Sequence, residues 1–420
     1  MTEYAAEAES TDDKENIWSN GIILLLCAGE ILLMMGLTFL VPILPKFIAT
    51  LGVQEKAIGT AMGLAVTAFG TARVLMDIPA GKISKHLGRR LLLVGSPLVV
   101  FISAIGCCLT TSYWQLIIWR IMQGAGTAGY SVTALIVLAE LSKPSNRGLY
   151  ISFFWAAALI GTSLGPSFGG LMGEYLGFNA VFISYALAAL LTGIAVFLRI
   201  PAETTAAWSY AHSTTKAKSS SNFIYNKNFI LACLVALLTL ITVGGTQTTL
   251  IPLVGYELLS ISSSQVGIGL TIIAVMQFCL TPFAGSISDK VGRKKLIVPG
   301  GIIAALGLVM FAHSMSYWFF ILSSVILGLG RGIGGPVPTA YVADLAFKDD
   351  YESTLAAFRA ISDLGWVIGP LGCGYLKDLY GLALPFHITA GMLFVIVILF
   401  GMIAKETIIE KKDKYVSENC

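Results

Sequence analysis

The sequence predicts an all-α polytopic membrane protein with twelve transmembrane helices, arranged as two parallel six-helix repeats. Three observations support this fold class. Of the 420 residues, 56% are hydrophobic and only 12% are charged, whereas soluble domains carry about 25% charged residues. Apolar runs of about 18 or more residues, long enough to cross a hydrocarbon layer of roughly 30 Å, recur along the whole chain. Short motifs of the first half also return in the second half at a constant distance.

Twelve apolar runs mark the expected transmembrane helices. Those of the first half are residues 20–43, 57–80, 91–111, 115–138, 149–172 and 178–199, and those of the second half are residues 228–252, 264–284, 296–314, 318–343, 354–376 and 383–404. The chain is thus expected to consist of a tail (1–19), a six-helix bundle (20–199), a polar linker (200–227), a second six-helix bundle (228–404) and a tail (405–420). The first tail is acidic and lacks the basic start of a signal peptide, so the first run is expected to stay in place.

The lysine and arginine residues predict the orientation in the membrane. Four of the 27 lie within the predicted helices, Lys46, Lys56 and Lys377 fall on one side, and all the others fall on the side that carries both termini. The positive-inside rule makes that side cytoplasmic. We expect a monomer in the plasma membrane that contacts the lipid bilayer. No nucleic-acid partner is expected, because no basic stripe with interleaved aromatic residues occurs.

A short basic segment occurs twice, as "GKISKHLGRR" from Gly81 and as "GSISDKVGRKK" from Gly285. Each is expected to be the loop between the second and third helices of its half. The matching residues are 204 positions apart. Equivalent pairs are Gly81 and Gly285, Gly88 and Gly292, Arg89 and Arg293, and Glu140 and Asp344. Because six helices return the chain to the same side, the two halves are parallel repeats, related by an axis along the membrane normal.

The second copy of this segment resembles the loop signature of the major facilitator superfamily, and the resemblance covers essentially the whole chain. It implies the major facilitator fold, in which two six-helix bundles surround a central cavity that opens alternately to each side. The first copy departs from the signature, because Lys85 stands where the second copy has Asp289. The charge network of the first half is therefore expected to be connected differently.

Two further motifs are similar to those of the drug:proton antiporter branch of this family. The predicted fourth helix carries "RIMQGAG" from Arg120, and the fifth carries "GTSLGPSFGG" from Gly161. Together they imply exchange of a substrate for protons. The residues of the second motif are Gly161, Gly165, Pro166, Gly169 and Gly170. Glycines four residues apart allow close helix packing and proline removes a backbone donor, so ordinary tight packing is the alternative interpretation.

Charged pairs occur in the second and eleventh predicted helices. Arg73 and Asp77 are four residues apart, and so are Arg359 and Asp363, so each pair can share one helix face. Since the resemblance places these helices at the interface between the halves, the four charges could form a cytoplasmic latch. The alternative is two separate intrahelical pairs. We expect Glu140 and Asp344 to pair with Arg89 or Arg293 in the basic segments.

The predicted first helix contains Glu30 about ten residues from its start, which places the carboxyl group about 15 Å deep. A carboxyl group at this depth could carry a proton or pair with a cationic substrate. The alternative is permanent pairing with Arg120. The resemblance places further polar residues of helices 4, 7 and 10 around the cavity, and these are Arg120, Gln123, Gln247 and Arg331. Glycine and proline around the last two predict irregular helix there.

The sequence does not resemble an enzyme. It contains no nucleotide-binding, serine-hydrolase or zinc-protease motif. Its four histidines and seven cysteines show no metal-ligand spacing, so no metal and no cofactor is expected. We expect a secondary active transporter that exports small cationic or lipophilic organic compounds in exchange for protons. The alternatives are a proton-coupled importer of an organic anion, held by Arg120 and Arg331, and a membrane receptor or scaffold.

Overall fold

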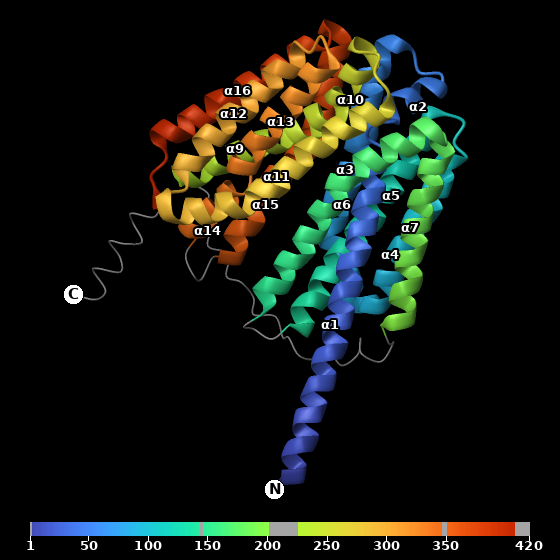
Figure 1. The fold of residues 1–420 in the computed structure, drawn as a ribbon, viewed down its shortest axis with the longest axis vertical. Helices are drawn as coiled ribbons and strands as arrows, with labels where there is room; N and C mark the ends of the chain where they lie inside the picture. Colours follow the sequence, from blue (N-terminus) through green and yellow to red (C-terminus); the bar gives the residue numbers. More distant parts are fainter. Residues whose placement is uncertain (1, 143–145, 201–225, 347–350, 408–420) are drawn as a thin grey trace, which may run out of the picture.

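The computed structural model describes residues 2–142, 146–200, 226–346 and 351–407. Every regular element in these ranges is a helix (Figure 1). Most of the predicted linker at 200–227 and of the predicted tail at 405–420 lies outside the described residues. The predicted tail at 1–19 is continuous with the first helix from Thr2 onward.

The first half contains six long helices and two short ones. The long helices are α1 (Thr2–Phe39), α3 (Ile58–Leu87), α4 (Arg89–Cys108), α5 (Tyr113–Leu141), α6 (Arg147–Tyr175) and α7 (Phe178–Arg199). They correspond in order to the six predicted spans. Two short helices, α2 (Leu44–Thr50) and η1 (Glu55–Ala57), connect α1 to α3.

The second half repeats this order with two irregular helices. Its seventh predicted span is one helix built from α9 (Lys227–Ile241), η3 (Thr242–Leu250), α10 (Ile251–Leu253) and η4 (Val254–Leu258). It is followed by α11 (Ser263–Val291), α12 (Lys294–Ala312), α13 (Tyr317–Gly334), α14 (Val337–Leu345), α15 (Tyr351–Tyr380) and α16 (Ala383–Ile403). Both η3 and η4 are π-helical, and Gly335 and Pro336 separate α13 from α14. The predicted irregular helix around Gln247 and Arg331 is thus confirmed.

Eleven helices of the described residues are long and apolar enough to cross a membrane. The predicted span that is not among these eleven is the eleventh, at residues 354–376, which falls within α15; this helix is less apolar because it carries Arg359, Asp363, Lys377 and Asp378. With 30 residues, α15 is still about 45 Å long. It packs along α9 and η3 of its own half and along α3 of the first half.

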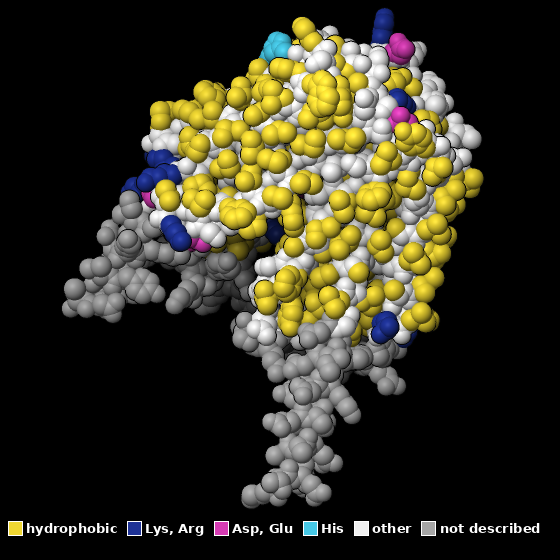
Figure 2. All heavy atoms as spheres, viewed as in Figure 1, with side chains coloured by type: hydrophobic (Ala, Val, Ile, Leu, Met, Phe, Trp, Pro, Cys, Tyr) yellow, Lys and Arg dark blue, Asp and Glu magenta, His cyan; other side chains and the backbone are white. Residues whose placement is uncertain are grey.

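The halves form two bundles that meet mainly through two helix pairs, α3 with α15 and α6 with α11 (Figure 1). The largest buried apolar cluster comprises only residues of the second half, so that half has its own core. Figure 2 shows hydrophobic side chains over the visible outer surface of both halves and charged side chains mainly toward the ends. It also shows a hollow between the halves at the end where the N-terminus lies, whereas the halves are in contact at the other end.

The two copies of the basic segment are mostly helical rather than loops, which corrects the sequence prediction. Residues 81–87 form the last turns of α3, and residues 285–291 form the last turns of α11. The chain turns only at Gly88 and Gly292, where φ is 92° and 120°. Such angles are accessible to glycine and costly for other residues. We call the end of the molecule that carries both copies the basic end, and the other the opposite end.

Candidate functional site

Glu30 lies on α1 inside the first half, and its side chain is completely buried. Ser131 of α5 is its hydrogen-bond partner, with the hydroxyl oxygen 3.0 Å from each carboxylate oxygen. Among the described residues, no lysine or arginine nitrogen lies within 4.0 Å of the carboxylate. Arg73 of α3 is close enough to interact with it electrostatically. Glu30 is therefore a buried carboxyl group without a direct ion pair.

Arg120 of α5 is also buried but does not pair with Glu30, so that alternative is wrong. Its Nη1 donates to Oε1 of Gln123 at 2.9 Å, and its Nε donates to the carbonyl oxygen of Ala65 at 3.4 Å. Its guanidinium carbon lies 4.9 Å from the ring centre of Phe69. Arg120 cannot reach Glu30 because the two lie at different levels along α5. The residue of α5 that faces Glu30 is Ser131, and Arg120 lies eleven residues earlier, about 16 Å along the helix axis.

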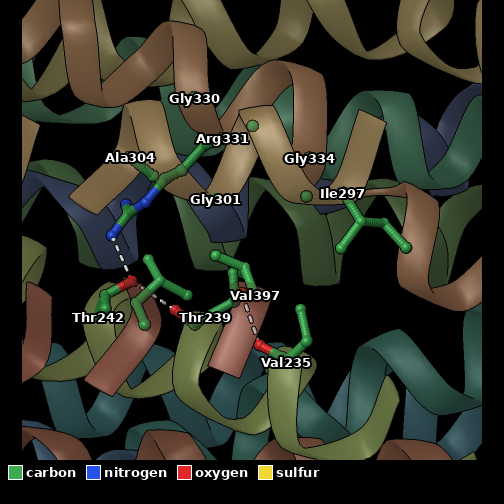
Figure 3. Close-up of a pocket in the computed structure, with 13 residues that line it drawn as sticks. Val235, Thr239, Thr242, Ile297, Gly301, Ala304, Gly330, Arg331, Gly334 and Val397 are labelled. Carbon is green, nitrogen blue, oxygen red and sulfur yellow. Dashed lines mark hydrogen bonds between the residues drawn. The ribbon is translucent and has the colours of Figure 1, made fainter. Parts of the chain in front are cut away.

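Arg331 of α13 forms a second polar cluster, inside the second half (Figure 3). Its Nη1 donates to Oε1 of Gln247, and its Nη2 donates to the hydroxyl of Thr242 at 3.1 Å. In the part of the chain that the structure describes, its buried Nε has no hydrogen-bond partner. The adjoining pocket is lined mainly by small and apolar residues, including Gly301 and Ala304. A buried guanidinium with a free donor is able to bind an anionic group.

The five residues predicted around the cavity thus fall into two groups, which the structure does not bring together. Glu30, Arg120 and Gln123 belong to the first half, and Gln247 and Arg331 belong to the second. All except the partly accessible Gln247 are buried in this conformation. Within the first half, Glu30 bonds to Ser131 and lies apart from Arg120, which bonds to Gln123, and in the second half Arg331 bonds to Gln247.

The four charges predicted as a latch do lie near one another. Asp77 of α3 interacts electrostatically with Arg73 on its own helix and with Arg359 and Asp363 of α15. No ion pair within 4.0 Å joins any of these four groups in the described structure. Instead, the guanidinium carbon of Arg359 lies 5.0 Å from the ring centre of Trp155 on α6, which belongs to the other half.

At the basic end, the predicted pairing of carboxylates with the repeated arginines is confirmed. Arg89 bonds to Glu140 through two nitrogens at 2.5 and 3.2 Å, and Arg293 donates to Asp344 at 3.0 Å. Asp289 adds a contact of 2.6 Å to Arg293 that the first half lacks, because Lys85 occupies the equivalent position. Each pair lies within one half, so these contacts stabilise the individual bundles.

The glycines of the fifth-helix motif, on α6, pack against α1. A Cβ atom at Gly161 would lie 2.5 Å from the carbonyl oxygen of Ile31, the residue after Glu30. A Cβ at Gly165 or at Gly169 would collide with the next turns of α1, and one at Gly170 with the backbone of Ser263 in the other half. The motif therefore fixes the position of the helix that carries Glu30.

Sequence reasoning missed three neighbours of these groups, namely Ser131, Thr242 and Trp155. The first two are polar residues within predicted spans, which was a usable signal, whereas nothing in the sequence indicated the stacking of Trp155 on Arg359. No group of three or more histidine, cysteine or acidic residues that could hold a metal ion occurs in the described ranges.

Comparison with known proteins identifies the family. The family model described as Major Facilitator Superfamily matches residues 26–259 and 236–417, which together span nearly the whole chain. The chain belongs to the major facilitator superfamily. Members of this superfamily are secondary transporters and not enzymes, and the predicted fold class and family are thereby confirmed.

Individual relatives are distant. The chain is 25% identical over 350 residues to a Lactococcus lactis protein named "Multi-drug resistance efflux pump PmrA homolog", covering 80% of this chain and 82% of the relative. It is 23% identical over 396 residues to the multidrug resistance protein MdtG of Proteus mirabilis, covering 91% and 95%. Among solved structures, a D-xylose-proton symporter superposes with a TM-score of 0.74 at 19% identity, covering 93% of this chain and 98% of that one. That likeness shows the fold alone.

Proposed function

We propose that this superfamily member is a proton-coupled exporter of small cationic or lipophilic organic compounds. It works by alternating access between its two bundles (20–199 and 228–404), as a monomer in the plasma membrane with both termini in the cytoplasm. The observation that carries this proposal is the burial of Glu30 without a direct ion pair. The names of the distant relatives as multidrug efflux pumps support the same direction of transport.

Glu30 suits a proton carrier because of its surroundings. A carboxylate that is buried without a counter-ion is strongly destabilised, whereas its protonated form needs only hydrogen bonds, which the hydroxyl of Ser131 supplies. Arg73, which acts from a distance, can favour the charged form whenever the helices move closer. A change of conformation could therefore bind or release one proton at this site.

In this orientation the hollow at the basic end opens to the cytoplasm, so the structure represents an inward-open state. In an inward-open state the four charges predicted as a latch would not form ion pairs with one another. This agrees with the structure, where no ion pair within 4.0 Å among the described residues joins Arg73 or Asp77 to Arg359 or Asp363. Arg359 stacks on Trp155 in this state and would exchange that contact for Asp77 when the cytoplasmic end closes. This exchange gives the halves two alternative contacts for one guanidinium group.

Replacement of Glu30 by glutamine tests the proposal. Glutamine resembles the protonated carboxyl group at nearly constant volume, so Glu30→Gln should fold and bind substrate but should not exchange protons. In inverted membrane vesicles energised by a proton gradient, uptake of a lipophilic cation should fall to the level seen without a gradient. Substrate-induced thermal stabilisation of the purified variant should persist.

Glu55→Gln is the matched control, because Glu55 is an accessible carboxylate of η1 at the opposite end. It should transport like the wild type. Uphill uptake by Glu30→Gln at the wild-type level would remove Glu30 as the coupling residue, and Asp363 would be the next residue to test.

A second candidate function, import of an organic anion with protons, is favoured by one observation. Arg120 and Arg331 are both buried, and neither has a carboxylate partner among the described residues. A substrate carboxylate could supply that partner. A thermal-shift screen with lipophilic cations and carboxylic acids in parallel separates the two functions. Stabilisation by carboxylic acids alone would establish the second candidate and overturn the first.

A further inference from the structure

The two halves are joined at the opposite end by a carboxylate that caps a helix of the other half. Asp378 of α15 accepts hydrogen bonds from the backbone nitrogens of Gly59 at 3.0 Å and Thr60 at 2.6 Å. These are the second and third residues of α3. The first backbone N–H groups of a helix have no partner within it and carry a partial positive charge, so an anion there is stabilising.

The same contact occurs a second time, related by the internal repeat. Glu174 of α6 accepts a hydrogen bond from the backbone nitrogen of Ser264 at 3.1 Å, in the first turn of α11. Glu174 and Asp378 are 204 residues apart, as are Thr60 and Ser264. The first-half carboxylate therefore caps the second half, and the second-half carboxylate caps the first.

About one turn along α3 and α11 from the two caps, the helix pairs α3–α15 and α6–α11 cross at equivalent glycines. A Cβ at Gly63 would collide with the carbonyl of Pro370, and one at Gly267 would collide with the carbonyl of Pro166. Gly63 and Gly267 share the offset of 204, as do the two prolines. The atoms nearest to each added Cβ all belong to the backbone, so α3 and α15, and likewise α6 and α11, approach each other closely at these crossings.

One turn further along, equivalent threonines make hydrogen bonds across both crossings, although to partners that are not equivalent. The hydroxyl of Thr67 donates to the carbonyl oxygen of Val367 at 2.9 Å, across the α3–α15 crossing. The hydroxyl of Thr271 accepts from the backbone nitrogen of Ser167 at 3.1 Å and lies 2.8 Å from its Oγ, across the α6–α11 crossing. Thr67 and Thr271 are again 204 residues apart.

The two caps differ in their surroundings. The side chain of Asp378 is only 9% exposed, and the ammonium group of Lys377 lies 3.4 Å away, itself bonded to Glu257 at 2.6 Å. Glu174 is exposed at the molecular surface. Hydrogen bonds of a carboxylate weaken when water competes for it, so the Asp378 cap should contribute more than the Glu174 cap.

We propose that Glu174 and Asp378 are a repeat-related pair of gate residues that hold the opposite end closed, and that both caps break when this end opens. The caps join different halves, so they exist only while the halves are in contact there. This inference rests on the alternating access of the proposed function, but not on its substrate or its coupling ion.

Distances between spin labels test the gate directly. One label pair at Gln54 and Leu258 reports on the opposite end, and another at Lys85 and Lys290 reports on the basic end. All four positions are exposed. Measurements on the protein without substrate give the ratio of molecules open at the opposite end to molecules closed there. The result does not depend on transport, so failure of the exporter proposal leaves this test intact.

Asp378→Asn keeps one acceptor oxygen and loses the charge, and it should raise this ratio roughly tenfold. Glu174→Gln, at an exposed position that tolerates substitution, should raise it by about two- to threefold, since water screens this cap. In both variants the basic-end distance should shorten in step. Glu55→Gln is the control, being an exposed carboxylate at the same end, and should leave both distances unchanged.

Unchanged distances in folded Asp378→Asn and Glu174→Gln proteins would overturn the proposal. The same holds if thermal stability falls in both variants while both label distances stay at the wild-type values, because the caps would then only stabilise helix ends. If Asp378→Asn fails to fold, the ratio measured for Glu174→Gln decides.

Discussion

An alanine at one crossing glycine should shift the balance between the two conformations, and Gly63→Ala is the most informative case. The added Cβ would collide with the backbone carbonyl of Pro370 and lie 2.9 Å from the Cα of Leu371. No side chain can move aside there, so α3 and α15 must separate by about 1 Å, to the 3.4 Å of an ordinary contact. Overpacking of this kind costs about 1–3 kcal/mol.

The cost falls only on the state in which the opposite end is closed. The ratio of open to closed molecules at that end should therefore rise by roughly 5- to 150-fold, since about 1.4 kcal/mol corresponds to a factor of ten. The label pair at Gln54 and Leu258 measures this ratio. Gly267→Ala, at the equivalent crossing of α6 and α11, should behave in the same way.

Gly372→Ala is the matched control. This glycine lies on α15, two residues from Pro370, but a Cβ there would have no atom within 4 Å. Both substitutions raise the intrinsic helix propensity by about 1 kcal/mol, so a difference between them isolates the collision at the crossing. If Gly63→Ala and Gly372→Ala give the same distance distribution, the crossing is not tight enough to control the gate.

Three further predictions follow from the buried and paired charges. Glu140→Gln removes the ion pair with Arg89 and should lower the free energy of unfolding by about 1–3 kcal/mol, measured by thermal unfolding in detergent, with substrate binding retained. Arg331→Met should leave the affinity for a lipophilic cation within about threefold in a binding assay, and a loss above tenfold would place this arginine in the cation site. Arg73→Asp should change the labelling of cysteines at the basic end, and adding Asp363→Arg should restore it; additive effects would instead indicate separate intrahelical pairs.

Much of the fold could be predicted because the motifs of the first half recur in the second half at a constant separation in the sequence. The constant offset of 204 residues predicted the equivalence of the halves. Pairing of Glu140 and Asp344 with the repeated arginines was also predicted, but which arginine bonds to which carboxylate came only from the structure. The ends of α3 and α11 could not be predicted from composition. Glycine and charged residues after an apolar run indicate a loop, but the helix continues until a glycine with positive φ turns the chain.

The partners of Glu30 show the limit of reasoning from one sequence. Counting residues along α1 gives the depth of a side chain but not its direction around the helix axis or the level of residues on neighbouring helices. Arg120 and Ser131 lie on the same helix, yet only Ser131 is level with the carboxyl group. The two gate carboxylates, by contrast, could have been found, because Glu174 and Asp378 obey the same offset as the basic segments.

The π-helical stretch η3 gives the second half a different way of bending from the first. The equivalent residues 38–46 of the first half contain a joint, where α1 ends at Phe39 and α2 begins at Leu44. A joint bends by rotation about a few backbone bonds. In a π-helix each N–H can exchange its partner for one a residue nearer, so the helix can tighten and turn about its axis without losing hydrogen bonds. The two repeats thus differ at this position, with a break between two helices in the first half and a continuous π-helix in the second, and we expect the two bundles to contribute unequal motions to each transport cycle.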